Sequence, residues 1–155
     1  MRGPRVRRTR RGTYRLKISR DERDLLRSLP GQLREALETS DPSTERLFPP
    51  ADPDDAEASS RYRDLVGDQL LEGRLSALDT MEATIDAPEL DEEQITAWLT
   101  TLNDMRLVLG TQLDVSEDPE PLPRDHPDAS RMAVYGYLGW LVSEIVEALS
   151  GDRGS

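Results

Sequence analysis

Arginine is the residue whose number and spacing first suggest chemistry in this sequence. Residues 1–20 carry nine basic side chains and no acidic one, and all but one of the nine are arginine. A guanidinium offers a fork of N–H donors that fits phosphate, and clustered arginines give salt-dependent contacts with nucleic-acid backbones. The arginines that we expect to bind phosphates are Arg5, Arg7, Arg8, Arg10 and Arg11. The alternative is a solvated tail without a partner.

The net charge is divided unevenly between this stretch and the rest of the chain. The whole chain carries −11, whereas residues 21–155 hold 11 arginines against 31 acidic residues, which gives −20. Two regions of opposite charge bind different partners or bind each other. The partners expected for the basic stretch are therefore DNA or an acidic protein surface.

The residue types that carry out nucleophilic or metal chemistry are scarce. The sequence has no cysteine, which excludes disulfides, thiolate metal sites and thiol redox chemistry. The one histidine, His126, stands between Asp125 and Pro127 and is expected in a solvated loop. No glycine-rich phosphate loop follows a predicted strand, and the many carboxylates are typical of a solvated acidic face. We predict no catalytic residue, no metal site and no cofactor, and we do not expect an enzyme.

Charged side chains also fall within apolar helix faces. On a helical wheel Arg106 lies among the leucines of residues 99–109, and Glu82 lies similarly in the preceding helical run, with Arg74 at the edge of its stripe. Burying an unpaired charge is costly, so each needs a partner. We predict that Arg106 and Glu82 form a buried structural ion pair, or that the stem of Arg106 lies along the core with its head in water. A site for a ligand anion is the alternative.

Apolar residues at helical spacing predict four or five helices. A capping box at Ser19–Glu22 begins the first, and Asp91–Gln94 begins a later one. The most apolar run, residues 131–149, is expected to be the central helix, with Gly136 and Gly139 admitting a close neighbour. Its uninterrupted apolar stretch is roughly half of the ~20 residues that a membrane span needs, so no membrane is expected.

A short strand pattern stands near the N-terminus. Tyr14, Leu16 and Ile18 alternate with charged residues, and the best partner strand is residues 111–115. The predicted fold is therefore mainly α, a four- to five-helix bundle-like domain with at most a short two-stranded β pair at about residues 13–18 and 111–115. The predicted parts are a basic disordered tail at 1–12, a single helical domain at 13–150 with an acidic proline-rich loop at 116–128, and a frayed C-terminus at 151–155.

Several stretches together resemble a known family. They are LFPPADPDD at residues 47–55, YRDL at 62–65, WLTTLNDMRLVLGT at 98–111, and the helix at 135–149. These stretches are similar to the actinobacterial family of uncharacterised domains that includes the AosR-like oxidative-stress transcriptional regulators. The resemblance covers about residues 13–149, and its most specific part is the Leu-Asn-Asp-x-Arg-Leu-x-Leu-Gly-Thr motif.

The resemblance implies a cytoplasmic regulator of transcription that senses oxidative stress by disulfide formation and works with the transcription machinery. Without cysteine that switch cannot operate in this chain. We therefore expect a cytoplasmic regulatory protein that binds the DNA backbone, a protein of the transcription machinery, or both. Genes of the family commonly lie beside that of the Clp protease adaptor. The alternative is thus a protein-interaction module without DNA binding, linked to Clp proteolysis.

Base-specific reading of DNA has little support in the sequence. A helix-turn-helix protein places a recognition helix in the major groove. Every predicted helix except the one beside the basic stretch has an acidic outer face, which DNA would repel. The expected contact with DNA is therefore made to the phosphates.

Overall fold

The computed structural model describes residues 5–48, 56–113 and 124–151, with side chains from residue 65 onward in the second range. The elements in chain order are β1 (Val6–Arg8), β2 (Tyr14–Leu16), α1 (Arg20–Glu38), the 3-10 helix η1 (Pro42–Leu47), α2 (Ala56–Ala83), β3 (Glu89–Leu90), α3 (Glu92–Gln112) and α4 (Ala129–Ser150). The predicted mainly helical fold is confirmed, with a small three-stranded sheet in place of a two-stranded pair.

Two helices begin at the capping boxes that the sequence contains. At the start of α1 the Ser19 hydroxyl accepts from the Glu22 amide at 3.1 Å, and the Glu22 carboxylate accepts from the Ser19 amide at 3.2 Å. Asp91 and Gln94 make the same exchange at the start of α3, at 2.8 and 2.9 Å. Each exchange satisfies two amides that have no partner within the helix, which fixes where the helix begins.

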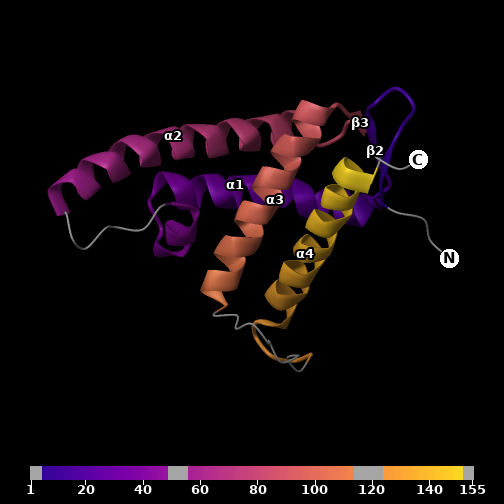
Figure 1. Ribbon diagram of the computed structural model, residues 1–155. Coiled ribbons are helices and arrows are strands. Elements are labelled where there is room, and N and C mark those ends of the chain that lie inside the picture. Colours follow the sequence, from indigo (N-terminus) through magenta and orange to yellow (C-terminus); the bar gives the residue numbers. More distant parts are fainter. Residues whose placement is uncertain (1–4, 49–55, 114–123, 152–155) are drawn as a thin grey trace.

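The helices pack around α3 (Figure 1). α4 runs antiparallel beside α3, α2 crosses near the start of α3, and α1 passes behind both α3 and α4. The buried face of α3 carries the largest share of the core: Ile95, Trp98, Leu102, Met105, Val108 and Leu109. The central helix is therefore α3.

The prediction that residues 131–149 form the central helix is wrong. Within α4 the buried residues are Leu138, Leu141 and Ile145, and the rest of its surface is partly or fully exposed. Gly139 lies 3.5 Å, measured from the position of an added Cβ, from the side chain of Arg106, whereas nothing lies within 4 Å at Gly136. Apolar residues spread around a helix do not show which side its neighbours cover.

The sheet has the order β1–β2–β3 and is antiparallel throughout. The strand predicted at residues 13–18 is β2, but its predicted partner at 111–115 is wrong. α3 continues through Gln112, and the amide of Leu113 still bonds to the carbonyl of Leu109 at 2.9 Å. The rest of that range lies outside the described residues. Helical hydrogen bonding takes precedence there over a short apolar alternation.

The predicted disordered tail, residues 1–12, is wrong where the structure describes it. Val6 is 3% exposed and stands opposite Leu16 in the β1–β2 pair. Gly12 completes the turn between the strands with a φ of +84°, a left-handed conformation that glycine adopts without strain. One buried valine and a ladder to β2 order a stretch whose charge predicts disorder.

Among the described residues, one helix is long and apolar enough to cross a membrane, judged by length and composition alone. That helix is α4, which packs against α3 and β1. Core helices of soluble proteins pass the same test. Most of the predicted acidic loop at 116–128 and of the C-terminal end at 151–155 lies outside the described residues.

Candidate nucleic-acid interface on the N-terminal hairpin

The hairpin, residues 5–16, consists of β1, the turn and β2. Its inner side is buried against the rest of the fold through Val6, Tyr14 and Leu16. On the outer side the register places Arg7 opposite Arg15, and Arg15 opposite Glu89 of β3. Like charges that face each other across a strand pair are unfavourable. The row is therefore balanced at the Glu89 end and positive at the Arg7 end.

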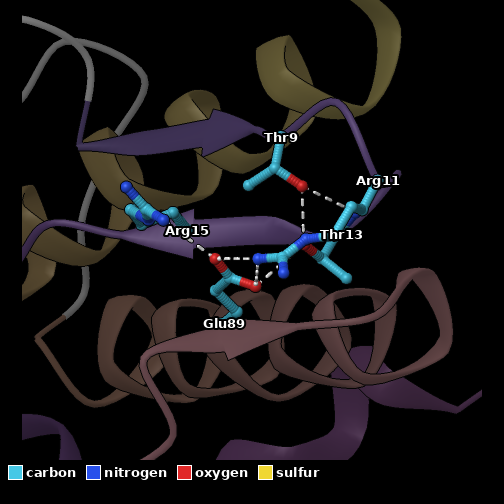
Figure 2. A network of polar contacts seen from close by, with 5 residues as sticks. All are labelled: Thr9, Arg11, Thr13, Arg15 and Glu89. Atoms are coloured by element: carbon cyan, nitrogen blue, oxygen red, sulfur yellow. Dashed lines mark hydrogen bonds and ion pairs between the residues drawn. The ribbon is translucent and has the colours of Figure 1, made fainter.

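Glu89 gathers the hydrogen bonds of the hairpin turn and β2 (Figure 2). Arg11 donates to both carboxylate oxygens at 2.9 Å, and Arg15 donates to one of them at 3.0 Å. The Thr13 hydroxyl adds a bond at 3.2 Å. The hydrogen bond from Arg15, helped by Thr13 and by the charge of Arg11, holds the pKa of Glu89 below its ordinary value. Two of the hairpin cations are thus already paired with one anion.

Arg5 fastens the hairpin to the helices. Its amide donates to the Glu144 carboxylate of α4 at 2.9 Å, and its guanidinium donates to the Lys17 carbonyl at 3.1 Å. The guanidinium also lies 3.4 Å from the Glu22 carboxylate and 5.9 Å from the ring centroid of Trp140. Arg5 is therefore held by several elements of its own chain, in contrast to its predicted role in phosphate binding.

The Glu22 carboxylate that pairs with Arg5 also accepts from the Tyr137 hydroxyl at 2.9 Å. Burial raises the pKa of Glu22. Hydrogen bonds from Tyr137 and Ser19 and the charge of Arg5 together lower it by more, so the net pKa lies below the ordinary value. Burial and the same hydrogen bond raise the pKa of the Tyr137 phenol. This carboxylate therefore stays ionised and joins α1, α4 and the hairpin.

Three further arginines of the hairpin are exposed: Arg7, Arg8 and Arg10, called here the exposed hairpin arginines. In the part of the chain that the structure describes, neither Arg7 nor Arg10 forms an ion pair. Arg11 is also largely in water, with 72% of its side chain exposed, but it is bound to Glu89. The hairpin thus brings all five predicted phosphate-binding residues together, and it leaves Arg7 and Arg10 the most available.

The predicted ion pair between Arg106 and Glu82 is wrong. Glu82 is exposed on α2 and pairs with Arg34 of α1. Arg106 is half-buried, donates to the Asn103 side chain at 2.8 Å and lays its stem against Gly139 of α4. The Nε of Arg106 is buried without a hydrogen-bond partner among the described residues, so the other form of the prediction, with the head in water, stays a prediction.

The ion pair in the interior joins Arg74 of α2 to Asp104 of α3. Their nitrogen and oxygen atoms are 2.5 Å apart, and Arg74 also donates to the Leu47 carbonyl at 2.9 Å. The Asp104 side chain is 3% exposed. Burial raises the pKa of Asp104 more than the guanidinium lowers it. Arg74 was predicted at the edge of its stripe, but its partner was missed.

The position of α3 explains why the partner of Arg74 was not predicted. α2 packs on one flank of this helix and α4 on the other, so directions roughly opposite on the wheel both lead into the interior. Asp104 faces α2 and Arg106 faces α4. An acidic residue within the apolar run 98–109 was the available signal, and it needed a neighbouring helix on both sides to be interpreted.

These features define a class of protein: a mainly helical domain whose acidic body carries an arginine-bearing β-hairpin. The chain belongs to the family described as a domain of unknown function, DUF2017, whose model matches residues 1–149. The family resemblance identified in the sequence is thereby confirmed.

Curated relatives come from mycobacteria. The chain is 32% identical over 136 residues to proteins named oxidative stress regulator AosR from Mycobacterium bovis (strain ATCC BAA-935 / AF2122/97) and Mycobacterium tuberculosis (strain ATCC 25618 / H37Rv). Each match covers 76% of this chain and 62% of the relative. The chain therefore spans about three-fifths of the length of the curated relatives it matches. No solved structure matches the chain.

Proposed function

We propose that this chain is a cytoplasmic regulatory protein, associated with transcription, that acts by binding rather than by catalysis. The exposed hairpin arginines contact DNA phosphates, and the acidic body meets a protein of the transcription machinery. One observation carries the proposal. Arg7 and Arg10 are exposed and, among the described residues, form no ion pair, whereas Arg5, Arg11 and Arg15 of the same hairpin are paired with carboxylates. The curated relatives are named as regulators, which supports the regulatory part of the proposal.

The charge distribution limits how the protein can meet DNA. Residues 21–155 carry a net −20, so a duplex is repelled by the body and attracted only by the hairpin. About three phosphate contacts give a log–log salt slope of roughly −2.7, a loss of about 40-fold in affinity between 50 and 200 mM salt. The expected binding is modest, independent of base sequence and strongly dependent on salt.

Regulation in this chain proceeds without a cysteine switch. The sequence has no thiol, so disulfide formation cannot couple oxidative stress to binding within it. Any response to oxidants must come through a partner or through the four methionines. Purified protein should therefore keep its melting temperature and association state under diamide.

A second function has one specific observation in its favour. Arg5, Arg11 and Arg15 already bind carboxylates, so the hairpin is suited to an acidic protein surface as well as to phosphate. In this alternative the chain is a protein-interaction module without DNA binding, and its partner is a component of Clp proteolysis. Affinity capture from native lysate, with and without nuclease, separates the two. Nuclease-resistant polymerase or sigma subunits favour the first function, and Clp components favour the second.

The direct test is a salt titration of DNA binding with matched variants. Anisotropy of a labelled duplex of arbitrary sequence is measured with the parent and with Arg7→Gln/Arg10→Gln. The variant should bind more weakly, with a slope smaller in magnitude by about 2, because each phosphate contact contributes roughly 0.9. The control, Arg46→Gln/Arg124→Gln, removes the same charge at exposed positions outside the hairpin. Equal affinity and slope in the parent and the hairpin variant would overturn the proposal.

A further inference from the structure

An exposed tryptophan lies beside the basic hairpin. The sequence contains two tryptophans; Trp98 is fully buried, whereas Trp140 of α4 is 42% exposed. An aromatic ring left in water gives up a large part of the free energy that its burial would supply. A partly exposed indole next to clustered arginines is therefore a candidate contact for a ligand with flat rings and negative charge.

The ring of Trp140 has two neighbours, one from the hairpin and one from α4 itself. The Arg5 guanidinium lies 5.9 Å from its centroid, and the Tyr137 ring lies 5.9 Å away at a tilt of 39°. Arg5 is fixed in turn by its bonds to Glu144 and Lys17. The indole is thus positioned before any ligand arrives, which lowers the entropy cost of binding.

The space beside the ring along the outer side of α4 is open. Gly136 precedes Trp140 by one turn, and an added Cβ there would meet nothing within 4 Å. Ser143, almost one turn beyond, is small and exposed. The Arg5 guanidinium lies over one face of the indole, so a flat group would have to stack on the other face.

Cations stand close to this platform. Arg5 lies in the bend that directly precedes β1, and Arg7 follows two residues later in the strand, so their Cα atoms are at most about 7 Å apart. The Arg5 guanidinium lies 5.9 Å from the ring centroid, and Arg7, the next cation along the chain, is exposed. Glu147, exposed two turns beyond Trp140, disfavours phosphate along the helix. The hairpin must therefore supply the phosphate contacts.

We infer that Trp140 and the hairpin together form a binding site for single-stranded nucleic acid. One base stacks on the indole, and the adjacent phosphates bind Arg7 and the other exposed hairpin arginines. Aromatic platforms beside basic tracks bind single strands without sequence preference. The bases of a duplex are stacked on each other and cannot reach the ring. This inference rests on the proposed function and narrows its ligand to an unpaired strand.

The fluorescence of Trp140 reports such binding directly, because Trp98 is buried and away from any added ligand. The full chain is titrated with an unlabelled single-stranded oligonucleotide of mixed sequence and, separately, with a duplex of equal length. The single strand should quench the exposed indole and bind more tightly than the duplex. Quenching by both ligands to the same extent and with the same affinity would contradict the inference.

Matched variants separate stacking from phosphate binding. Trp140→Leu should lower the affinity for the single strand by about five- to a hundredfold, as expected for the loss of one stacked base. Its affinity for the duplex should stay unchanged, and Trp140→Phe should keep most of the affinity for the single strand. The control is Leu65→Ala, which removes another exposed apolar side chain, on α2. Each variant is first checked for an unchanged melting temperature.

The outcomes distinguish this inference from the function on which it rests. If Trp140→Leu binds the single strand as well as the parent does, the inference fails and the proposed function stands. If Arg7→Gln/Arg10→Gln binds both ligands like the parent, the proposed function itself fails. Emission that changes with protein concentration alone would assign the ring to a contact between copies of this chain and would also overturn the inference.

Discussion

Two arginine–carboxylate contacts in this molecule use the same chemistry at different depths. At the hairpin, Arg11 and Glu89 keep 72% and 22% of their side chains exposed; between α2 and α3, Arg74 and Asp104 keep 20% and 3%. Exposed pairs are weak because water and salt screen them, whereas breaking a buried pair strands a charge. Cations at the hairpin can therefore exchange a carboxylate for a phosphate, and Arg74 cannot.

The pKa values of the two carboxylates follow the same division. Hydrogen bonding and charge lower the pKa of Glu89, while burial raises that of Asp104 despite its arginine. The second oxygen of Asp104 has no hydrogen-bond partner among the described residues, which adds to the cost of its charge. The depth of burial, and not the identity of the partner, decides whether the pKa of the carboxylate is raised or lowered.

The largest expected effect comes from breaking the buried pair. Asp104→Leu leaves Arg74 without its counter-ion and should cost about 3–5 kcal/mol of unfolding free energy. The double variant Arg74→Met/Asp104→Leu should lose much less. Glu82→Leu, at an exposed pair with Arg34, should cost at most about 1 kcal/mol. Chemical denaturation of the parent, these three variants and Arg74→Met alone measures these values, and additive losses at Arg74 and Asp104 would reject their coupling.

The second effect tests whether the hairpin is part of the fold. Val6→Ala removes buried apolar surface and should lower the unfolding free energy by about 2 kcal/mol. Val146→Ala makes the same change at a residue of α4 that is 46% exposed and should have little effect. Thermal or urea unfolding compares the two. Similar stabilities in both variants would mean that β1 contributes nothing to the fold.

The third prediction tests whether the exposed ion pairs of the hairpin can be exchanged for phosphate. Glu89→Gln removes the anion that holds Arg11 and Arg15, so both become available to phosphate. Nucleic-acid affinity should rise, and the salt slope should steepen by up to about 2. Glu45→Gln removes the same charge from an exposed position on η1 and serves as the control. Weaker binding in Glu89→Gln would show that the carboxylate positions the arginines rather than competing for them.

The smallest effect is an opposite pH dependence. The lowered pKa of Glu89 gives stability that is complete above its ordinary pKa and is lost as the pH falls through the lowered value. The raised pKa of Asp104 makes its ionised form oppose folding, and that opposition vanishes as the pH falls. Between about pH 7 and about pH 3, the melting temperature should fall less in Glu89→Gln than in the parent, and more in Asp104→Asn. Identical falls in all three proteins would contradict this assignment.

Local signals in the sequence were sufficient to predict the helices, but they were insufficient to predict which elements pack against each helix. The capping boxes at Ser19 and Asp91 located the starts of α1 and α3, because a cap depends only on residues a few positions apart. A wheel identifies an apolar face, but it does not say which element covers it. For this reason Arg106 was assigned the wrong partner and α4 the central position.

The arginines of the candidate site were predicted from the sequence, but the β-hairpin that carries them was not. Its arginines were evident from their number, but a single valine among them gave too little pattern to predict a strand. The partner of β2 is the two-residue strand β3, which is too short to be recognised before the chain is folded. Trp140 lies within the apolar run 131–149, and its exposure beside Arg5 depends on how α4 meets the hairpin.

Glu22 has a consequence for local opening of the fold. Its carboxylate closes the first turn of α1, accepts from Tyr137 of α4 and lies beside Arg5 of the hairpin. Amide protons exchange with solvent when the segment that holds them opens. Since one carboxylate restrains all three segments, fraying of the first turn also loosens the hairpin and its contact with α4. The amide protons of Ser19 and Arg5 should therefore exchange at a common rate, as parts of one cooperative unit.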